Sequence, residues 1–551
     1  MSSSQHTLKL SEKLGYALGD GAANIAWRGV STFLFIFYTD VYGLDPAAVG
    51  LLMLVARSGD GISDIFMGIL GDRTKSKHGR FRPWILWSAV PLGLILSLLF
   101  TTPDLNDGGK LIYAYITYIL FTLIYTANNV PYGALMAVMT PCHQERTVLG
   151  SYRMAGAFVG GMVVQGTLLA LVLHFGNVNP EIKVEPLAEV DTFKVTLAAP
   201  VDVASASIKT ENGIGQFTWA DATDGEKSKR VSFALEANQE YSFIVSNEAN
   251  LTADDISLIN QKQGYQYSMY IMSALLTIFV LITFLTTKER VTPPKDQKSN
   301  LSKDLKDLIS NKPWLILLGV GLLFNVYNSV KQGITVIYFV HYIHNELLAG
   351  TYLVALMLAS IVGAISVAVL SKKWGKKKLF IYALIFSGAV NTLFMFCGPT
   401  DIAAIFVIGV VSEFASAMFP TLFFAMLGDA ADYSQWKNGR RATGLVYSAG
   451  SFATKFGGGL AAVIIGFVLS AYQYDGQSEQ AIQGAIPGII MLMSWVPAVI
   501  AIVTSFLIYF YPLGQDKMDE ISVELYGKPD YKGDDLTTNK EQNSSLEPTL
   551  N

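Results

Sequence analysis

Residues 51–73 read LLMLVARSGDGISDIFMGILGDR, a stretch apolar enough to cross a membrane as a helix and yet interrupted by charges. Arg57, Asp60 and Asp64 all fall in the middle of it. A charged side chain near the centre of a bilayer costs at least about 2.5–3.5 kcal/mol, so such groups usually face a protein interior that uses them. The stretch therefore indicates a membrane protein with an interior pathway for an ion or a polar ligand.

Similar apolar stretches recur along the chain. Of its 551 residues, 51% are hydrophobic and only 15% are charged, which is well below the charged share of a soluble domain. Twelve stretches are near or above the roughly 20 residues that cross a bilayer as a helix. We place them at 16–42, 47–71, 83–102, 111–139, 152–176, 265–287, 313–343, 348–370, 378–397, 402–428, 442–471 and 485–512. The predicted fold class is an all-α membrane protein of twelve helices.

Basic residues mark one side of the predicted membrane. Lys and Arg gather in the loops 71–83 and 371–378 and in the linker after the sixth span, whereas four loops on the other side, YGLDPAA, HNELLAG, CGPTDI and YQYDGQSEQ, carry none. Short loops rich in Lys and Arg remain in the cytoplasm. We therefore expect a multi-pass protein of the inner (cytoplasmic) membrane with both termini in the cytoplasm.

One segment breaks the helical pattern. Residues 177–262 are polar, and pieces such as TFKVTLAAP and EYSFIVSN alternate like short strands. We expect a small β-rich extracytoplasmic insert, which either binds carbohydrate or a partner or is a decorated loop without its own activity. The other divisions are a cytoplasmic N-terminus (1–15), the first five helices (16–176), the sixth helix (263–290), a cytoplasmic linker (291–312), the C-terminal six helices (313–512) and a polar, disordered cytoplasmic tail (513–551).

The two halves of the chain have similar sequence patterns. WRGVSTFLFIFYTDV in the first span and VKQGITVIYFVHYI in the seventh place Arg28 and Lys331 at equivalent positions. Pseudo-symmetric six-helix halves are typical of transporters, whose substrate site lies near mid-membrane between the halves. The chain has no P-loop, and its six histidines lack the spacing of metal ligands. We therefore expect no enzyme, no nucleic-acid partner and no cofactor other than a coupling cation; the oligomeric state is not predicted.

The paired aspartates are the candidate cation site. Asp60 and Asp64 are spaced i, i+4 and share one helix face, with Ser63 beside them. Their carboxylates can supply oxygen ligands to a metal ion, with sodium favoured, or share a proton because close like charges raise one pKa. The alternative is a structural ion network inside the bundle. We favour coupling to a cation.

Several other polar residues are predicted to lie in the bundle interior and to bind the substrate. Asparagine amides and aromatic rings suit sugar hydroxyls and sugar rings, and buried cations need an acid or an anionic ligand. The interior cations slightly outnumber the interior acids, which favours a substrate that carries an anion. The candidate substrate-binding residues are Asn24, Arg28, Asn129, Arg153, Lys331 and Lys455, and the interior acids are Asp20, Asp60, Asp64 and Glu413.

The segments 55–84, 128–140, 144–153 and 428–460 carry a family resemblance. They read VARSGDGISDIFMGILGDRTKSKHGRFRPW, NNVPYGALMAVMT, QERTVLGSYR and GDAADYSQWKNGRRATGLVYSAGSFATKFGGGL, and they resemble the glycoside–pentoside–hexuronide:cation symporters of the major facilitator superfamily. The resemblance implies the major facilitator fold. It also implies cation binding by Asp60 and Asp64 with oxygen ligands from Ser63 and Thr126, and it places Arg57 beside the pair, Arg153 at the sugar and Lys455 near both sites.

Three departures from the family pattern bear on the substrate. Asn24 and Asn129 stand where the family's galactoside carriers have two aspartates that grip the sugar, and Gly133 stands where they have a tryptophan that stacks on it. A galactoside is therefore disfavoured, while an anionic sugar gains support and Gly133 leaves room for a larger ligand.

We predict a secondary active transporter that couples uptake of a glycoside, oligosaccharide or uronide to a cation, with Na⁺ favoured, by alternating access. Its partners are a small-molecule sugar and the lipid bilayer. One alternative is a proton-coupled sugar symporter. Another, of a different class, is a transporter-like sugar sensor that binds its ligand through the extracytoplasmic insert.

Overall fold

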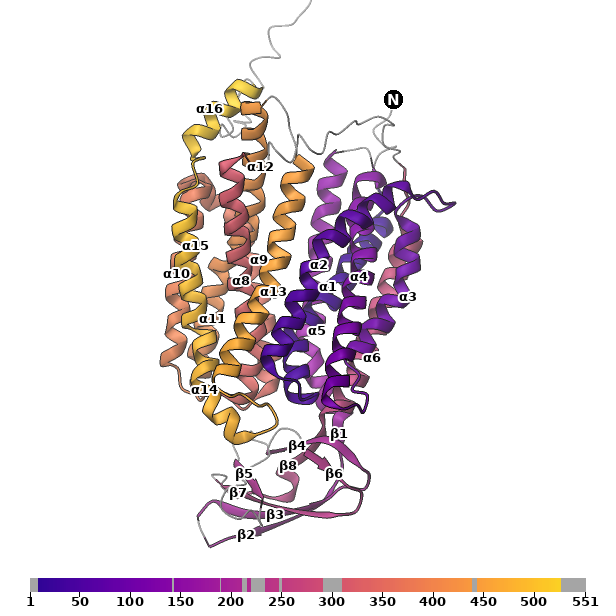
Figure 1. The fold of residues 1–551 in the computed structure, drawn as a ribbon, viewed down its shortest axis with the longest axis vertical. Coiled ribbons are helices and arrows are strands. Elements are labelled where there is room, and N and C mark those ends of the chain that lie inside the picture. The colour runs from indigo at the N-terminus through magenta and orange to yellow at the C-terminus, as the bar shows by residue number, and fades with distance from the viewer. Residues whose placement is uncertain are drawn as a thin grey trace, which may run out of the picture.

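The computed structural model describes residues 8–140, 143–188, 190–210, 216–219, 233–246, 250–290, 310–438 and 443–526. The predictions for most of the linker, 291–309, and for the tail beyond 526 lie outside these residues. The described chain forms two helical bundles side by side with a β domain at one end (Figure 1).

The first bundle is formed by the N-terminal helices. They are α1 (Leu10–Ile36), which continues as the π-helix η2 (Phe37–Val41), α2 (Pro46–Arg73), α3 (Arg82–Leu99), α4 (Asp107–Met139), α5 (His143–Gly176) and α6 (Gln261–Thr286). The start of α2 shows how local sequence sets these ends. Asp45 accepts a hydrogen bond from the Ala48 amide at 2.9 Å, and Pro46 occupies the first turn, where its missing N–H is not needed.

The second bundle contains the remaining helices. They are α8 (Lys312–His341), α9 (Glu346–Trp374), α10 (Lys376–Thr392) with the 3-10 turn η4 (Leu393–Phe396), α11 (Ile402–Ser416), α12 (Met418–Asn438), α13 (Thr443–Ala471), α14 (Glu479–Met493), α15 (Trp495–Tyr509) and α16 (Gln515–Tyr526). The predicted tenth and twelfth spans are each broken into two helices, at Ala417 and Ser494.

Nine stretches of the described residues are long and apolar enough to cross a membrane, with α11–α12 and α14–α15 each counted as one. The other three long helices of the bundles are α1, α2 and α13, which carry Asp20, Arg28, Arg57, Asp60, Asp64 and Lys455. Together they give the twelve spans of the predicted fold, which is confirmed. Charged residues lower the hydropathy of α1 and α2, where part of each helix faces the protein interior. In α13 the stretch Lys455–Ala471 is apolar but has fewer than 18 residues.

The two bundles approach most closely at the end that carries the β domain. There a side chain at Gly50 of α2 would meet the Ala462 carbonyl of α13 at 2.7 Å, so the two backbones touch. In Figure 1 the bundles separate toward the opposite end, where the N-terminus lies. The structure is thus a form closed on the side of the β domain.

The described residues between 177 and 260 form the β domain, which confirms its predicted strand character. It contains two antiparallel four-stranded sheets, β1-β8-β4-β6 and β2-β3-β7-β5. The strands are β1 (Asn177–Val178), β2 (Glu181–Pro186), β3 (Thr192–Ala198), β4 (Val203–Thr210), β5 (Gln216–Trp219), β6 (Phe233–Leu235), β7 (Glu240–Ser246) and β8 (Ile256–Asn260), with a 3-10 turn η3 (Ala253–Asp255). Both sheets contribute to a separate core that includes Leu197, Ile208, Phe243 and Leu258.

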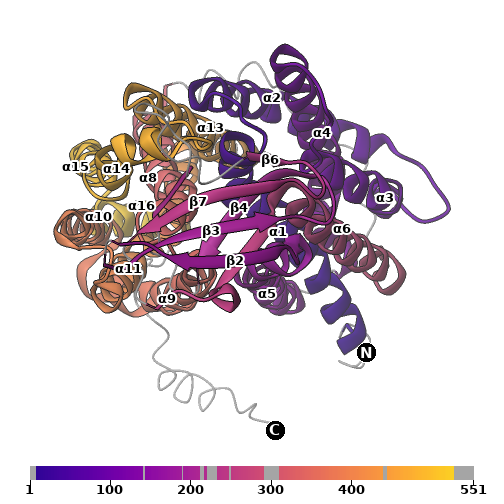
Figure 2. The ribbon, with the colours of Figure 1, turned by 90° about the horizontal axis from the view of Figure 1, so that it is seen from below.

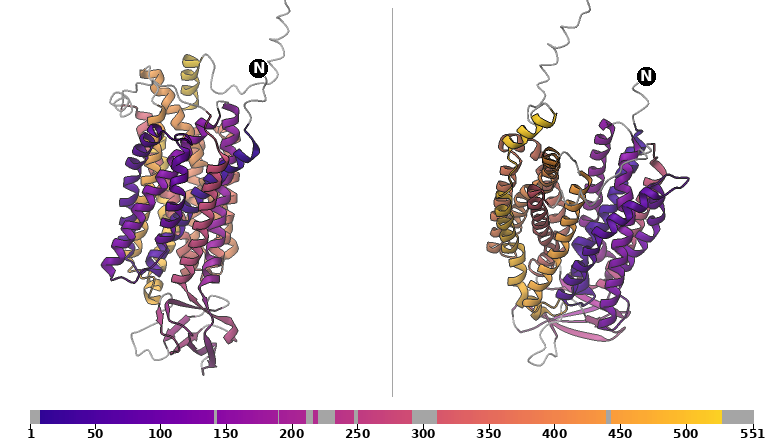
Figure 3. Two further views of the ribbon diagram at one scale, coloured as in Figure 1. Left: turned by 90° about the vertical axis from the view of Figure 1, so that its right-hand side faces the viewer. Right: turned by 45° about the horizontal axis from the view of Figure 1, so that its top comes forward.

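The β domain is attached to the bundle without a linker. β1 follows α5 directly, β8 leads directly into α6, and the two strands pair with each other. Asn260 caps α6 by accepting the Gln263 amide at 3.2 Å. Seen from below, the sheets lie across the end of both bundles (Figure 2), and Figure 3 shows them projecting from that end. The sixth helix starts at Gln261, two residues before the predicted boundary.

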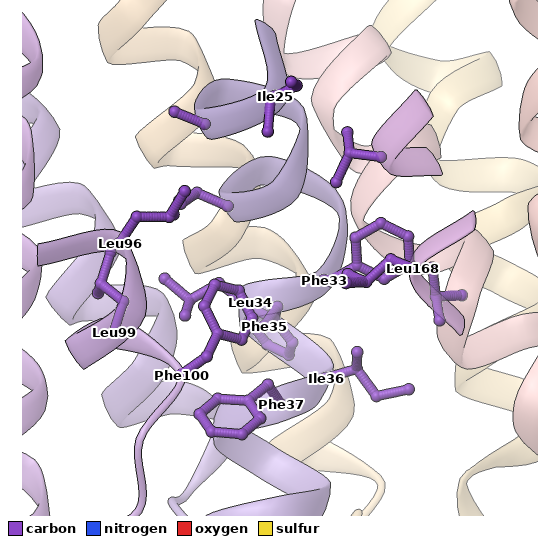
Figure 4. Close-up of a cluster of buried hydrophobic side chains, with 14 of the residues drawn as sticks. Ile25, Phe33, Leu34, Phe35, Ile36, Phe37, Leu96, Leu99, Phe100 and Leu168 are labelled. Atoms are coloured by element: carbon purple, nitrogen blue, oxygen red, sulfur yellow. The ribbon is translucent and has the colours of Figure 1, made fainter. Parts of the chain in front are cut away.

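The core of the first bundle is built on α1. Phe33, Leu34, Phe35 and Phe37 are fully or almost fully buried. Figure 4 shows Leu34 and Phe37 on the side of Leu99 and Phe100 of the α3 end, and Phe33 on the other side, next to Leu168 of α5. A helix that is hydrophobic on all sides over this stretch packs inside the bundle. This packing fixes α1 as a central helix, so its polar residues one to three turns earlier face the interior.

Two predicted boundaries at the chain ends differ from the structure. The first helix begins at Leu10, inside the segment predicted as the 1–15 terminus. Residues 515–526 of the predicted disordered tail form α16, which packs on α12. Trp436 donates a hydrogen bond to Glu524 at 2.5 Å, and Met518 and Ile521 are buried. The segment is polar overall, so its short apolar face, which packs on α12, was not recognised in the sequence.

Candidate functional site

A cavity of about 500 Å³ lies between the two bundles. Its walls come from helices of both halves, α1, α2, α5, α8, α9, α11, α12 and α13. Four predicted substrate residues line it, namely Asn24, Arg28, Lys331 and Lys455; Asn129 and Arg153 are not among its lining residues. Its volume is in the range of small-molecule sites, and most of its lining residues are polar or charged, which suits a polar ligand.

The predicted cation ligands lie together where α2 meets α4. Thr126 donates a hydrogen bond to Asp64 Oδ1 at 3.2 Å, and the Ser63 hydroxyl lies 3.5 Å from the Thr126 hydroxyl. Asp60, one turn earlier, is only 4% exposed. The charges that act on it are Lys455, Arg57 and Asp64. The structure thus gathers two carboxylates and two hydroxyls, all hard oxygen donors of the kind that alkali and alkaline-earth cations prefer.

Lys455 of α13 forms an ion pair with Asp64. The pair joins the C-terminal bundle to the cluster on α2 in the N-terminal bundle. Lys455 also lines the central cavity, so one amine touches both candidate sites. An ammonium at Asp64 places a monovalent charge where a coupling cation would bind.

Arg57 lies between the acidic cluster and the cavity. Its guanidinium carbon is 4.5 Å from the centre of the Trp27 ring, and its Nε donates to the Tyr118 hydroxyl at 3.3 Å. It is 6% exposed. Trp27 also lines the cavity, although the sequence analysis did not single it out.

Arg153 pairs within the first bundle. Its Nε lies 3.3 Å from Asp20 Oδ1, and its guanidinium carbon lies 5.4 Å from the centre of the Tyr132 ring. Asn24 donates to the backbone carbonyl of Asp20 at 2.9 Å. Asp20 therefore holds Arg153 near Asn24, next to the cavity wall.

Lys331 and Arg28 differ in their partners. The Lys331 amine lies 3.3 Å from Glu413 Oε2 and 3.0 Å from the Ser412 hydroxyl. Ser360 donates to the other Glu413 oxygen at 2.8 Å. Among the described residues, no hydrogen bond or ion pair holds the Arg28 guanidinium, which lines the cavity and feels the charge of Glu413. Arg28 is therefore the interior cation with charge available to a ligand.

Polar residues of α8 complete the wall and were missed in the sequence. Asn325, Asn328, Ser329 and Gln332 all line the cavity. Their spacing of i, i+3, i+4 and i+7 marks one helix face, and this periodicity could have identified them. Gln332 also meets Ser31 of α1 across the two bundles, with 3.4 Å between the side-chain oxygens.

A second ionic contact joins the bundles on the side of the β domain. His341 Nε2 of α8 lies 2.6 Å from Asp40 Oδ2 of η2, and the Tyr474 hydroxyl donates to Asp40 Oδ1 at 2.8 Å. All three residues are at most 4% exposed. Asp40 sits in the π-helical end of α1, a geometry that often marks functional positions. This triad connects the two bundles on the side of the β domain.

The chain matches a family model of MFS/sugar transport proteins over residues 15–515. It is 29% identical over 520 residues to the putative glycoside/cation symporter YagG of Escherichia coli K12, covering 94% of this chain and 95% of that protein. It is 28% identical to the isoprimeverose transporter of Lactiplantibacillus pentosus (94% and 90% covered) and 26% identical to the glucuronide carrier protein homolog of E. coli K12 (93% and 94% covered).

A solved structure of a bacterial homologue of the human lysosomal transporter Spinster, inward-facing and unoccupied, matches with a TM-score of 0.62 at 12% identity, covering 92% of this chain and 97% of that one. This likeness concerns the fold alone. The family model and the relatives confirm the resemblance to the glycoside symporters and describe transporters, not enzymes. The chain belongs to the MFS/sugar transport protein family of the major facilitator superfamily.

Proposed function

We propose that the protein couples Na⁺ to the uptake of an anionic glycoside, such as a uronide, through the cavity between the bundles. The observation that carries the proposal is the Lys455–Asp64 pair beside Asp60 and Thr126. Na⁺ binds to the oxygens of this cluster and displaces the Lys455 amine from Asp64. The amine is then released toward the cavity that it lines, where it adds positive charge for the substrate.

Arg28 supports an anionic substrate. The interior cations Arg28, Arg57, Arg153, Lys331 and Lys455 face the acids Asp20, Asp60, Asp64 and Glu413, one fewer in number. A buried cation without a partner is costly, and a carboxylate on the substrate would offset that cost at Arg28. The glucuronide named in one relative fits this reading, whereas the isoprimeverose named in another carries no acid.

Coupling follows from reciprocity. If Na⁺ raises the affinity for the sugar, the sugar raises the affinity for Na⁺ by the same factor. The two halves then rock around the filled site and expose it to each side in turn. Residues Asn24, Arg28, Lys331 and Lys455 would contact the sugar, with Arg153 and Asn129 near it; Asp60, Ser63, Asp64 and Thr126 would contact Na⁺.

The test is uptake of radiolabelled methyl β-glucuronide and methyl β-glucoside by purified protein in liposomes. One arm imposes a Na⁺ gradient at equal pH, and the other imposes a pH gradient without Na⁺. We expect glucuronide uptake driven by Na⁺, lost in Asp60→Asn and Asp64→Asn and retained in Asp45→Asn. Asp45 is a matched control because it caps the same helix from an exposed position.

Two outcomes would contradict parts of the proposal. Uptake driven only by the pH gradient would make the cation a proton. Uptake of the glucoside in preference to the glucuronide, unchanged in Arg28→Gln, would remove the anionic substrate and leave Arg28 with a structural role.

A further inference from the structure

Trp27 lies where the cavity and the cation cluster meet. It comes from the face of α1 that also presents Asn24, Arg28 and Ser31 to the cavity. Trp27 and Phe158 are the aromatic side chains among the described residues of the cavity wall. An aromatic face is electron-rich, so it attracts the slightly positive C–H groups on the face of a sugar ring.

The ring of Trp27 is held from the side of the cation cluster. Arg57 lies over it at 4.5 Å, and Tyr125 of α4 lies 5.7 Å away with its plane tilted by 31°. A guanidinium over an indole face is a favourable cation–π contact, stronger where water is excluded. Because Arg57 is buried, this contact fixes the orientation that the ring presents to the cavity.

Arg57 also lies beside the acidic cluster. It stands one helical turn before Asp60, and its charge acts on that carboxylate together with Lys455 and Asp64. A cation bound between Asp60 and Asp64 would compensate their charge and weaken their pull on Arg57. The indole face is then the contact that remains for the guanidinium, together with the Tyr118 hydroxyl.

We infer that Trp27 is the sugar-stacking residue of this transporter and that, through Arg57, it transmits occupancy of the cation site to the sugar. Cation binding strengthens the Arg57–Trp27 contact and fixes the ring as a platform for the sugar. Trp27 therefore contributes both to sugar affinity and to its dependence on the cation. This inference rests on the proposed function, from which it takes the cation at Asp60 and Asp64.

The test measures binding to purified full-length protein by calorimetry, with and without saturating Na⁺. The probes are methyl β-glucuronide and methyl β-glucoside, which lack an aromatic aglycone that could stack by itself. In Trp27→Leu we expect the affinity for the bound probe to fall at least about tenfold in Na⁺, and the ratio of affinities with and without Na⁺ to approach one. Trp27→Phe keeps an aromatic ring and should retain part of both effects.

Na⁺ binding alone separates this inference from the proposed function. Without sugar, Na⁺ should still raise the thermal stability of Trp27→Leu, although by less than that of the wild type because the contact that the cation strengthens is gone. This stabilisation also shows that the variant folds and keeps its cation site. The matched control is Phe158→Leu, the other aromatic residue of the wall, which should keep the affinity ratio.

Two results would overturn the inference. If Trp27→Leu binds the sugar as tightly as the wild type, Trp27 is not the stacking residue. If it loses the same factor with and without Na⁺, it stacks on the sugar but does not transmit cation binding. A wild type that shows no Na⁺ effect would instead refute the proposed cation, while the loss of affinity in Trp27→Leu would still decide the stacking role.

Discussion

The triad on the side of the β domain gives the sharpest mutational prediction. Asp40 accepts hydrogen bonds from His341 and Tyr474, both in the other bundle, at 2.6 and 2.8 Å. These groups must separate whenever the bundles part on this side, because Asp40 moves with α1. Weakening the triad should therefore shift the protein toward the form open on the side of the β domain.

The size of the shift follows from the two bonds. A hydrogen bond to a charged group contributes about 1.5–3 kcal/mol, so losing two removes at least about 3 kcal/mol. At about 1.4 kcal/mol per factor of ten, Asp40→Ala should change the ratio of closed to open forms about 100-fold. Asp40→Asn keeps both neighbours within reach and loses only the charge, so we expect roughly a tenfold change.

The assay is labelling of Ser31→Cys, a cavity position, in protein whose Cys142 and Cys397 are replaced by alanine. A membrane-impermeant maleimide is applied from the side of the β domain, and its rate reports the fraction open to that side. Thr39→Val is the matched control. Its hydroxyl also bonds Asp40, at 2.6 Å, but from the same helix, so its loss breaks nothing between the bundles.

Labelling that is no faster in Asp40→Ala than in the parent would refute the gating role of the triad. An equal acceleration in Thr39→Val would show that the effect arises from local packing of η2. Acceleration that follows the order Thr39→Val, Asp40→Asn, Asp40→Ala would support the role.

Two further perturbations follow from the packing and the charges. A side chain at Gly160 of α5 would collide with the Gly21 backbone carbonyl of α1. Because overpacking costs about 1–3 kcal/mol of folding free energy, Gly160→Ala should lower the melting temperature by several degrees. The control Gly133→Ala, at a position with open space, should leave the melting temperature unchanged. Lys455→Gln removes the amine that competes for Asp64, so Na⁺ titrations of intrinsic fluorescence should show about tenfold tighter Na⁺ binding; an unchanged affinity would mean that Lys455 does not occupy the cation position.

The helical framework could be predicted because each span is a continuous segment of mainly apolar residues. Crossing a bilayer needs about 20 apolar residues in sequence, and that requirement leaves a continuous signal. The breaks at Ala417 and Ser494 also have a local signal, which the sequence analysis did not use: Pro420 and Pro497 each follow a break by three residues, and a proline removes the helical hydrogen bond to the preceding turn. The helix α16 was missed for another reason: its apolar face is short and becomes visible only through its packing on α12.

The candidate site was predictable in its residue types and less so in its pairings. Spacing along one helix brought Ser63, Asp64 and Asp60 together, and the resemblance added Thr126. The partner of Asp64 is Lys455, which lies 391 residues away in sequence. No local pattern specifies such a pair, because it depends on how two separate bundles face each other. Trp27 was overlooked because an aromatic residue on an apolar helix is interpreted as a hydrophobic core residue until its neighbours are known.

The interior ion pairs fall into two kinds that behave differently when the bundles move. Pairs within one bundle are Arg153–Asp20 and Lys331–Glu413, and pairs between bundles are Lys455–Asp64 and His341–Asp40. A pair within a bundle travels with it as a rigid unit, whereas a pair between bundles must break during alternating access. Under the proposed function, the second kind would control which side opens.

Under the proposed function, the two contacts between bundles respond to different events. A cation at Asp64 displaces Lys455 and breaks the contact between the bundles at the cavity. The contact between Asp40 and His341 shares no residue with the cation site. Cation binding alone thus leaves the side of the β domain closed. A symporter needs the two contacts to break in response to different events. If the cation alone broke every contact between the bundles, it could cross the membrane without the sugar.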